Sequence, residues 1–224
     1  MLKNCLFPPL DVNKSLQYDI CMIIRSFVEP PIDNNNYLLM DEASREAVLI
    51  DCSCYDEEIE VELKKYDAQL KYILLTHGHF DHITGLNDFA GKAPVLMHEN
   101  DMEWIRELNT YLPMVGMPPM ETPKINRFIK DNEILKLGSI EIKVIHTPGH
   151  TQGGVCFYAD GNLFSGDTIF REAVGRCDLP GGDFYQIVES IEQRVFTLPD
   201  DTIIYPGHGS KTTVGWEKQH NQFL

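Results

Sequence analysis

Three histidines and one aspartate fall within six residues of the chain, in the segment Thr76-His77-Gly78-His79-Phe80-Asp81-His82. Packing rarely needs such a density of imidazole and carboxylate groups, and both groups are ligands of zinc, iron and manganese. The apolar run Tyr72-Ile73-Leu74-Leu75 precedes the cluster and is typical of a buried strand whose C-terminal loop carries a site. The segment 76–82 therefore predicts a metal centre.

Three later positions repeat one pattern, in which an apolar strand is followed by a short glycine-containing turn and a potential ligand. They are His150 in the run VIHTPGHT (144–151), Asp167 in LFSGDT (163–168) and His208 in IIYPGHG (203–209). Glycine permits tight backbone conformations beside each ligand, and strand ends support ligands rigidly. A histidine-rich surface loop, the alternative interpretation of 76–82, does not explain this series.

The candidate ligands are His77, His79, Asp81, His82, His150, Asp167 and His208. They exceed the needs of one tetrahedral zinc but suit two divalent metal ions that share a carboxylate. The simplest division gives His77, His79 and His150 to one ion. Its neighbour takes Asp81, His82 and His208, and Asp167 bridges the two ions beside a water or hydroxide. Zinc is the expected metal, with iron and manganese as alternatives. The remaining candidates for ligands lack this context and are expected at the surface or in the core: His98, His146 and His220.

Length and composition predict a single soluble domain over residues 1–224, with its core at about 18–210. The 224 residues are 43% hydrophobic and carry a net charge of −15, which disfavours nucleic acid and anionic membranes as partners. No apolar run approaches a membrane span, and no apolar segment precedes Pro8-Pro9 as a secretory signal requires. We therefore expect a cytoplasmic protein in which the six scattered cysteines are reduced.

The first half of the chain is predicted to form strands, then a helix, and then the strand that ends at the histidine cluster. After a lead-in at 1–15, a mostly buried strand is expected at 18–28, and the sequences at 30–31 and 33–36 indicate turns. Further expected strands are 37–40, 46–50, 71–75 and 94–97. Helices are expected at 56–66, where acidic residues come first and lysines last, at 84–90 and at 99–108.

Residues 109–126 show no regular pattern and contain four prolines with Met114, Met117 and Met120 between them. Long irregular segments in compact domains are commonly functional. We interpret 109–126 as a partly apolar lid or wall beside the site, with coverage of the core by the methionines as the alternative.

The second half repeats the order of strands followed by a helix. Strands are expected at 127–129, 133–137, 140–145, 155–158 and 162–164, with hairpin turns at Gly138 and Asp160-Gly161. A helix is expected at 183–196, where Ile187, Ile191 and Val195 share one face, and a last strand at 202–205.

Taken together, His-x-His-x-Asp-His at 77–82, Thr-Pro-Gly-His-Thr at 147–151, Gly-Asp-Thr at 166–168 and Pro-Gly-His-Gly at 206–209 resemble the metallo-β-lactamase superfamily over about 18–224. Within it, the chain is similar to the glyoxalase II-like branch, the hydroxyacylglutathione hydrolases. This narrower resemblance rests on Asp167, because β-lactamases of this fold typically have Cys or Ser at the corresponding position. The resemblance implies an α/β (α+β) fold, a four-layer αβ/βα sandwich of two mixed sheets flanked by helices, with metals at the edge between the sheets.

The resemblance has one departure. Full-length glyoxalase II carries a helical C-terminal extension whose basic residues help to hold glutathione, whereas this chain ends at Leu224, so a short form without that extension is expected. Arg176 stands where the family places a basic residue near the glutathione moiety, and it is the candidate anchor for a substrate carboxylate. The alternative is a structural Arg176 paired with Asp178 or Asp183.

The resemblance implies hydrolysis of a small-molecule thioester, S-lactoylglutathione or a related acyl-thioester, by a metal-bound hydroxide whose basicity Asp81 and Asp167 tune. One alternative is a persulfide dioxygenase of the same superfamily, with one iron held by His77, His150 and Asp167. Another is a metal-binding scaffold without activity. The motifs leave these alternatives open, together with the acyl group, the thiol carrier and the oligomeric state.

Overall fold

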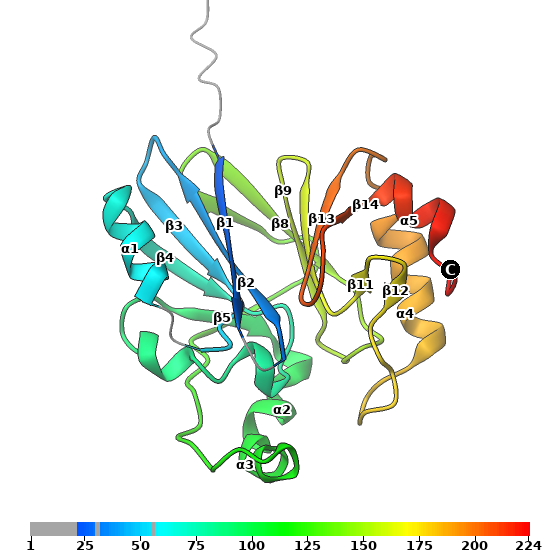
Figure 1. The fold of residues 1–224 in the computed structure, drawn as a ribbon, viewed down its shortest axis with the longest axis horizontal. Helices are drawn as coiled ribbons and strands as arrows, with labels where there is room; N and C mark the ends of the chain where they lie inside the picture. Colours follow the sequence, from blue (N-terminus) through cyan, green and yellow to red (C-terminus); the bar gives the residue numbers. More distant parts are fainter. Residues whose placement is uncertain (1–21, 30–31, 55–56) are drawn as a thin grey trace, which may run out of the picture.

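Two six-stranded sheets face each other, and helices cover the outer face of each sheet (Figure 1). The structure is a computed structural model that describes residues 22–29, 32–54 and 57–224. The predicted four-layer sandwich is confirmed. Within the described residues, no helix combines the length and the apolar composition needed to cross a membrane.

The first sheet is a meander extended by parallel strands, in the spatial order β1-β2-β3-β4-β5-β6. The pairs β1/β2 and β2/β3 are antiparallel, and each later pair is parallel. Its strands are β1 (Met22–Glu29), β2 (Asn34–Asp41), β3 (Glu46–Ile50), β4 (Gln69–Leu74), β5 (Val95–His98) and β6 (Arg127–Ile129).

The second sheet has the order β14-β13-β10-β9-β8-β7, and only its pair β10/β13 is parallel. Its strands are β7 (Ile134–Leu137), β8 (Ile140–His146), β9 (Val155–Ala159), β10 (Asn162–Gly166), β13 (Ile203–Pro206) and β14 (Thr212–Thr213). A small hairpin joins β11 (Ile169–Phe170) to β12 (Ala173–Val174).

The helices are short and lie outside the sheets. They are α1 (Glu57–Lys65), α2 (Met102–Arg106), α3 (Leu108–Tyr111), α4 (Phe184–Ser190) and α5 (Val214–His220). Single 3-10 turns form at Phe80–His82, Leu86–Phe89, Glu99–Asp101 and Leu112–Val115, and a π-helical turn, Ile191–Val195, continues α4.

The central strands are apolar on both sides because both of their faces are buried. In β2, Leu38 and Met40 pack toward the outer helices, whereas Tyr37 and Leu39 pack between the sheets. This alternation follows the two-residue period of a strand and explains the continuous apolar runs of the sequence. A third cluster, which includes Ile187, fills the space between the second sheet and α4.

Most of the expected elements exist, with shifted ends. The helix expected at 56–66 is α1, whose Glu57 and Glu58 stand in the first turn and Lys64 and Lys65 in the last. The helix expected at 183–196 is α4 with its π-helical continuation, capped by the Asp183 side chain, which accepts a hydrogen bond from the Gln186 amide. The lead-in at 1–15, the first residues of the strand expected from 18, the turn at 30–31 and position 56 lie outside the described residues.

Three expectations about local structure are wrong. Residues 34–36 are not a turn but begin β2, since the Asn35 side chain donates to the carbonyl oxygens of Pro206 and Gly209. The single helix expected at 99–108 is divided into a 3-10 turn, α2 and the start of α3. Residues 109–115 are helical, and the helical path ends at Gly116, whose φ of 79° favours glycine.

Candidate metal centre

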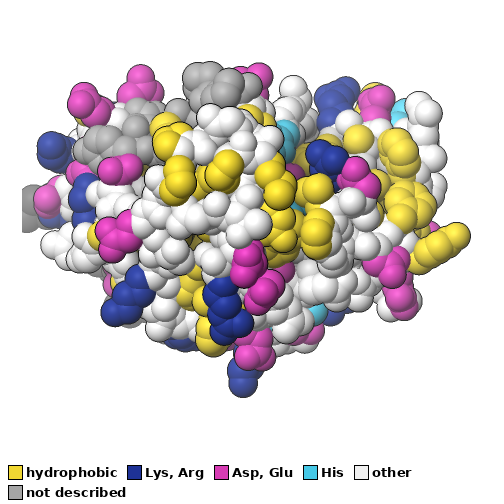
Figure 2. Space-filling view, turned by 90° about the horizontal axis from the view of Figure 1, so that it is seen from below, with side chains coloured by type: hydrophobic (Ala, Val, Ile, Leu, Met, Phe, Trp, Pro, Cys, Tyr) yellow, Lys and Arg dark blue, Asp and Glu magenta, His cyan; other side chains and the backbone are white. Residues whose placement is uncertain are grey.

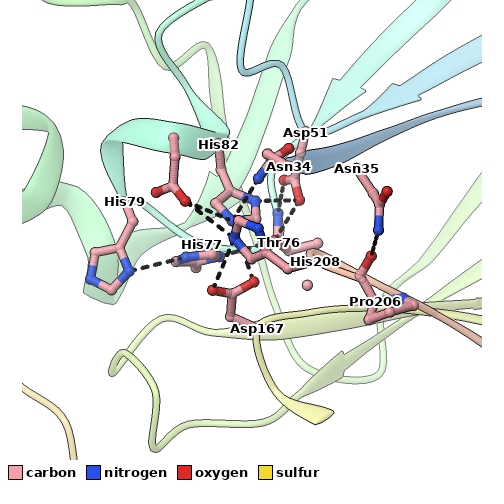
Figure 3. A network of polar contacts seen from close by, with 12 residues as sticks. Asn34, Asn35, Asp51, Thr76, His77, His79, His82, Asp167, Pro206 and His208 are labelled. Atoms are coloured by element: carbon pink, nitrogen blue, oxygen red, sulfur yellow. Dashed lines mark hydrogen bonds and ion pairs between the residues drawn. The ribbon is translucent and has the colours of Figure 1, made fainter. Parts of the chain in front are cut away.

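The seven candidate ligands meet at the edge between the two sheets. Figure 3 shows five of them, His77, His79, His82, Asp167 and His208. His77 and His79 follow β4, and Asp81 and His82 lie in the 3-10 turn Phe80–His82. The other three follow strands of the second sheet: His150 after β8, Asp167 after β10 and His208 after β13. Side chains 131 residues apart in the chain therefore converge because strands of both sheets end at one place.

His77, His79 and His150 form the first group able to hold a metal ion. The distances are 3.1 Å from His77 Nε2 to His79 Nδ1, 3.3 Å from His77 Nε2 to His150 Nε2, and 2.9 Å from His79 Nδ1 to His150 Nε2. Nitrogens bound to one tetrahedral zinc at about 2.0–2.1 Å lie about 3.3 Å apart, so the triangle is close to the size that an ion requires.

The ring protons of His77 and His150 lie on the outer side of this group. The Thr76 hydroxyl donates to Asp51, so it accepts from His77 Nδ1, and the carbonyl oxygen of Arg176 accepts from His150 Nδ1 at 2.7 Å. Their Nε2 lone pairs therefore face one another, an arrangement that a cation relieves. Burial, together with the neighbouring imidazoles, lowers the pKa of His79 to about 3 and holds the pKa of His77 well below its usual value.

Asp81, His82 and His208 form the second group. Asp81 Oδ2 lies 3.2 Å from His208 Nε2 and 3.8 Å from His82 Nε2. Burial alone lowers the pKa of His82, but the charges of Asp51 and Asp167 outweigh it and raise that pKa well above its usual value. Burial likewise lowers the pKa of His208, but the hydrogen bond that His208 donates to Asp81 and the charge of Asp167 outweigh it and raise that pKa. Protons therefore compete with a cation more strongly here than in the first group.

Asp167 faces both groups. Its Oδ2 atom lies 3.5 Å from His150 Nε2 and 3.7 Å from His208 Nε2, and its Oδ1 atom lies 3.4 Å from His82 Nε2. Burial raises the pKa of Asp167, but the surrounding histidines outweigh it and lower that pKa, so the group is a carboxylate. Its Oδ1 atom is buried without a hydrogen-bond partner, as is His79 Nε2. The donor set and this orphaned oxygen fit a pair of metal ions that share Asp167.

The Asn34 side chain was missed as a member of the site, because the asparagines at 34–36 indicated a turn. Its Nδ2 atom lies 2.9 Å from His82 Nε2, the nitrogen that faces the centre, and its backbone forms a bridge with His208. An ion bound by His82 would displace this amide contact.

Two buried aspartates behind the ligands were also missed as site residues. Asp51 accepts from the Thr76 amide, the Thr76 hydroxyl and His82 Nδ1, each at 2.8 Å. Asp101 accepts from the Gly78 amide at 2.9 Å, the Thr151 hydroxyl at 2.8 Å and the Gly153 amide at 2.6 Å. A local pattern could have predicted Asp51 as a site residue, because it is an acidic residue at the end of an apolar strand. No local pattern predicts Asp101.

Arg176 is paired with Asp178, as the structural alternative for this residue predicts. Its guanidinium donates two hydrogen bonds of 2.7 Å to Asp178, and both side chains are exposed. Arg176 also lines a cavity of about 680 Å³ that includes His79, Asp81, His150, Asp167 and His208.

The three histidines not assigned to the site lie apart from it. His98 and His146 stack on each other with ring centres 4.3 Å apart, and His220 stacks on Trp216. Among the described residues, none of the three belongs to a group able to hold an ion.

The fold and the paired donor groups define a class of metal-dependent enzyme, and sequence comparison identifies it. The family model of the metallo-beta-lactamase superfamily matches residues 31–208. The chain belongs to this superfamily, whose members bind divalent metals.

Curated relatives cover nearly the whole chain. A probable metallo-hydrolase of Streptococcus pyogenes is 35% identical, over 95% of this chain and 95% of the relative. The hydroxyacylglutathione hydrolase GloC of Haemophilus influenzae is 34% identical, over 84% of this chain and 92% of the relative.

Solved structures agree with the fold. The B3 metallo-beta-lactamase BLEG-1 is 34% identical with a TM-score of 0.82, covering 90% of this chain and 99% of its own. TTHA1623, solved in a di-iron-bound form, is 33% identical with a TM-score of 0.79, covering 89% and 100%. ETHE1 from Myxococcus xanthus is 28% identical with a TM-score of 0.74, covering 90% and 84%.

Proposed function

We propose that this protein hydrolyses thioesters at a two-metal centre, with His77, His79 and His150 holding one ion, Asp81, His82 and His208 holding the other, and Asp167 shared. The observation that carries the proposal is the position of Asp167, with one carboxylate within 3.7 Å of nitrogens from both groups. The resemblance to a hydroxyacylglutathione hydrolase of 34% identity supports the choice of a thioester.

When bound, two divalent ions supply a hydroxide nucleophile at neutral pH and polarise the substrate carbonyl. The chain's own residues prepare that chemistry. Neutral His77 and His79 offer lone pairs without first losing a proton, because burial lowers their pKa values. Asp167 and Asp81 would help to hold the ions, and their negative charge would raise the basicity of a bound hydroxide. Asp51 accepts a hydrogen bond from His82 Nδ1 and so fixes the orientation of that ring.

Single substitutions test this assignment. Replacing His79 or Asp167 with alanine removes a donor, and we expect thioester hydrolysis to fall by at least about a hundredfold, with loss of bound metal. His220→Ala is the matched control, since that imidazole is exposed and stacks on Trp216. Metal content per chain and hydrolysis rates are measured together. Full hydrolysis by either site variant would contradict the proposal.

A persulfide dioxygenase with one iron is the second candidate, and the similarity to ETHE1 from Myxococcus xanthus, at 28% identity and a TM-score of 0.74, supports keeping it. On that proposal His77, His150 and Asp167 hold the ion. Metal analysis of protein purified without added metal, combined with oxygen uptake on glutathione persulfide, separates the candidates. One iron per chain with rapid oxygen uptake would replace the hydrolase proposal, whereas two ions with no uptake supports it.

A further inference from the structure

The cavity beside the metal centre has two apolar walls. One is formed by α2, α3 and the 3-10 turn Leu112–Val115, and the other by the hairpin β11/β12 and the segment that follows it. The apolar lining residues of the first wall are Trp104, Leu108, Tyr111, Met114 and Val115, and those of the second are Phe170, Val174, Leu179 and Pro180. A volume of about 680 Å³ suits a ligand much larger than a lactoyl group.

Both walls begin at the candidate ligands. The Trp104 ring meets the His79 ring at 4.3 Å between centres and nearly perpendicular, and Tyr111 extends this wall at 4.8 Å from Trp104. On the other side, the Phe170 ring centre lies 6.2 Å from that of His208. Aromatic surface therefore lies on both sides of the donor groups.

The first wall continues to the protein surface as exposed apolar side chains. Met114 is 75% exposed and Val115 is 50% exposed. Figure 2 shows hydrophobic side chains gathered over the middle of this face, beside one of the patches of histidine surface visible there. Apolar surface grouped at the mouth of a cavity is typical of a ligand site.

Few charges are available to hold a carboxylate-rich or phosphate-rich carrier. Among the described residues that line the cavity, Arg176 is the single lysine or arginine, and Asp178 already accepts two hydrogen bonds from it. The chain as a whole has a net charge of −15, which repels a polyanionic substrate. Recognition through apolar contact is therefore favoured over recognition through substrate carboxylates.

We propose that the wall from Trp104 to Val115 binds an apolar acyl group, so that the substrates are thioesters of medium-chain or aromatic acids on a small, weakly charged thiol. This inference rests on the proposed thioester hydrolysis and names its substrate class. This wall overlaps at 109–115 with the segment 109–126 that the sequence predicts as a lid or wall.

A series of acyl chains on one neutral thiol tests the proposal with the metal-loaded protein. On N-acetylcysteamine thioesters, we expect kcat/KM to rise by up to about fourfold per methylene from acetyl through butyryl to hexanoyl, the factor that about 0.8 kcal/mol per buried methylene gives. Hexanoyl should exceed acetyl by at least about tenfold, and lactoyl should not exceed butyryl. A flat series, or a preference for lactoyl on glutathione, would overturn the proposal while leaving thioester hydrolysis intact.

Matched variants locate the effect. Val115→Gln places a polar group on the wall, and we expect the ratio of kcat/KM for hexanoyl over acetyl to fall by about threefold. Val61→Gln makes the same change at a residue of α1 that does not line this cavity and is 59% exposed, so the ratio should not change. An unchanged ratio in Val115→Gln would contradict the placement of the acyl group on this wall.

Binding without turnover separates this proposal from the proposed function. The chain has two tryptophans, so Trp216→Phe leaves Trp104 as the fluorescence reporter of the wall. We expect hexanoate to quench Trp104 with a Kd at least about tenfold below that of acetate. Tighter binding of hexanoate by a protein that hydrolyses no thioester would support the apolar acyl site and overturn the proposed function. Equal binding of the two acids would overturn the acyl site whatever the protein hydrolyses.

Discussion

Asp51 supports both donor groups although it belongs to neither. It accepts directly from His82 Nδ1, and it reaches His77 through the Thr76 hydroxyl. Its own φ of 59° is in the left-handed region, which non-glycine residues other than Asn and Asp rarely adopt. A carboxylate that accepts a hydrogen bond from the outer N–H of a ligand imidazole fixes the tautomer of that ring and raises its basicity as a ligand.

Asp51→Asn tests this support at the scale of one residue. Asparagine tolerates the same backbone conformation but lacks the charge, so we expect metal affinity to fall by about 10- to 100-fold with the fold preserved. Competition with a chelator measures the affinity of each site. Asp67→Asn is the matched control, because Asp67 also has a positive φ, 49°, and is exposed. Equal affinities in the wild type and Asp51→Asn would refute this role.

At the scale of elements, Asp101 joins two ligand-bearing turns. It lies at the end of the 3-10 turn Glu99–Asp101 and accepts from Gly78, between His77 and His79, and from Thr151 and Gly153, beside His150. A Cβ atom on Gly153 would approach Asp101 Oδ1 to 2.6 Å, so the close contact requires glycine there. The turns of the first donor group are therefore held together by one side chain.

Asp101→Asn should loosen both turns at once. The amide retains one acceptor oxygen and directs an NH2 group at main-chain donors, so we expect a loss of at least about 2 kcal/mol in the free energy of unfolding. We also expect about tenfold weaker metal binding at the first group. Urea unfolding of the metal-free protein and metal titration measure the two effects, with the exposed Asp88→Asn as control. Weaker metal binding without a change in stability would show that Asp101 does not tie the turns together.

The sequence was sufficient to predict the strands that carry the donors and the positions of those donors, because an apolar run followed by glycine and a ligand is a local pattern. The strand before His77 and the strands before His150, Asp167 and His208 all exist. The structure brings the seven donors together, in the two predicted groups of three and in a third group that joins His77, His82 and Asp167. Their service as metal ligands stays a prediction.

The features that the sequence did not predict depend on distant contacts. The asparagines of β2 favour a turn locally, but Asn35 bonds to Pro206 and Gly209, about 170 residues away. Asp101 likewise gains its role from Gly78 and Thr151. The strand β14 and helix α5 did have a local signal, since Thr213 caps α5 by accepting from the Trp216 amide. These residues take part in the centre only through contacts with distant parts of the chain, and a local sequence pattern does not reveal such contacts.

At the scale of the whole molecule, β2 fastens the two halves together at both of its ends. Near the metal centre, the Asn35 amide donates to the carbonyl oxygen of Gly207 at 2.7 Å. At the other end of β2, Asp41 accepts from the amide and hydroxyl of Ser139 in the turn between β7 and β8, at 2.7 and 3.1 Å. A Cβ atom on Gly138 would lie 1.9 Å from Asp41 Oδ2, so this turn needs glycine to reach the carboxylate.

Asp41→Asn should weaken this attachment in a pH-dependent way. Burial raises the pKa of Asp41, but the hydrogen bonds from Ser139 and Ala43 outweigh it and lower that pKa in the folded protein. The ionised group therefore stabilises the fold above the unfolded-state pKa of about 3.9, and this contribution is lost as the pH falls through the lower folded-state pKa. We expect Asp41→Asn to cost about 1–3 kcal/mol between pH 5 and 8 and progressively less below about pH 4. Urea unfolding of the metal-free protein across this range measures the difference, with the exposed Asp201→Asn as control. A difference that stays constant or grows as the solution is acidified would mean that the Asp41 carboxylate does not hold the two halves together.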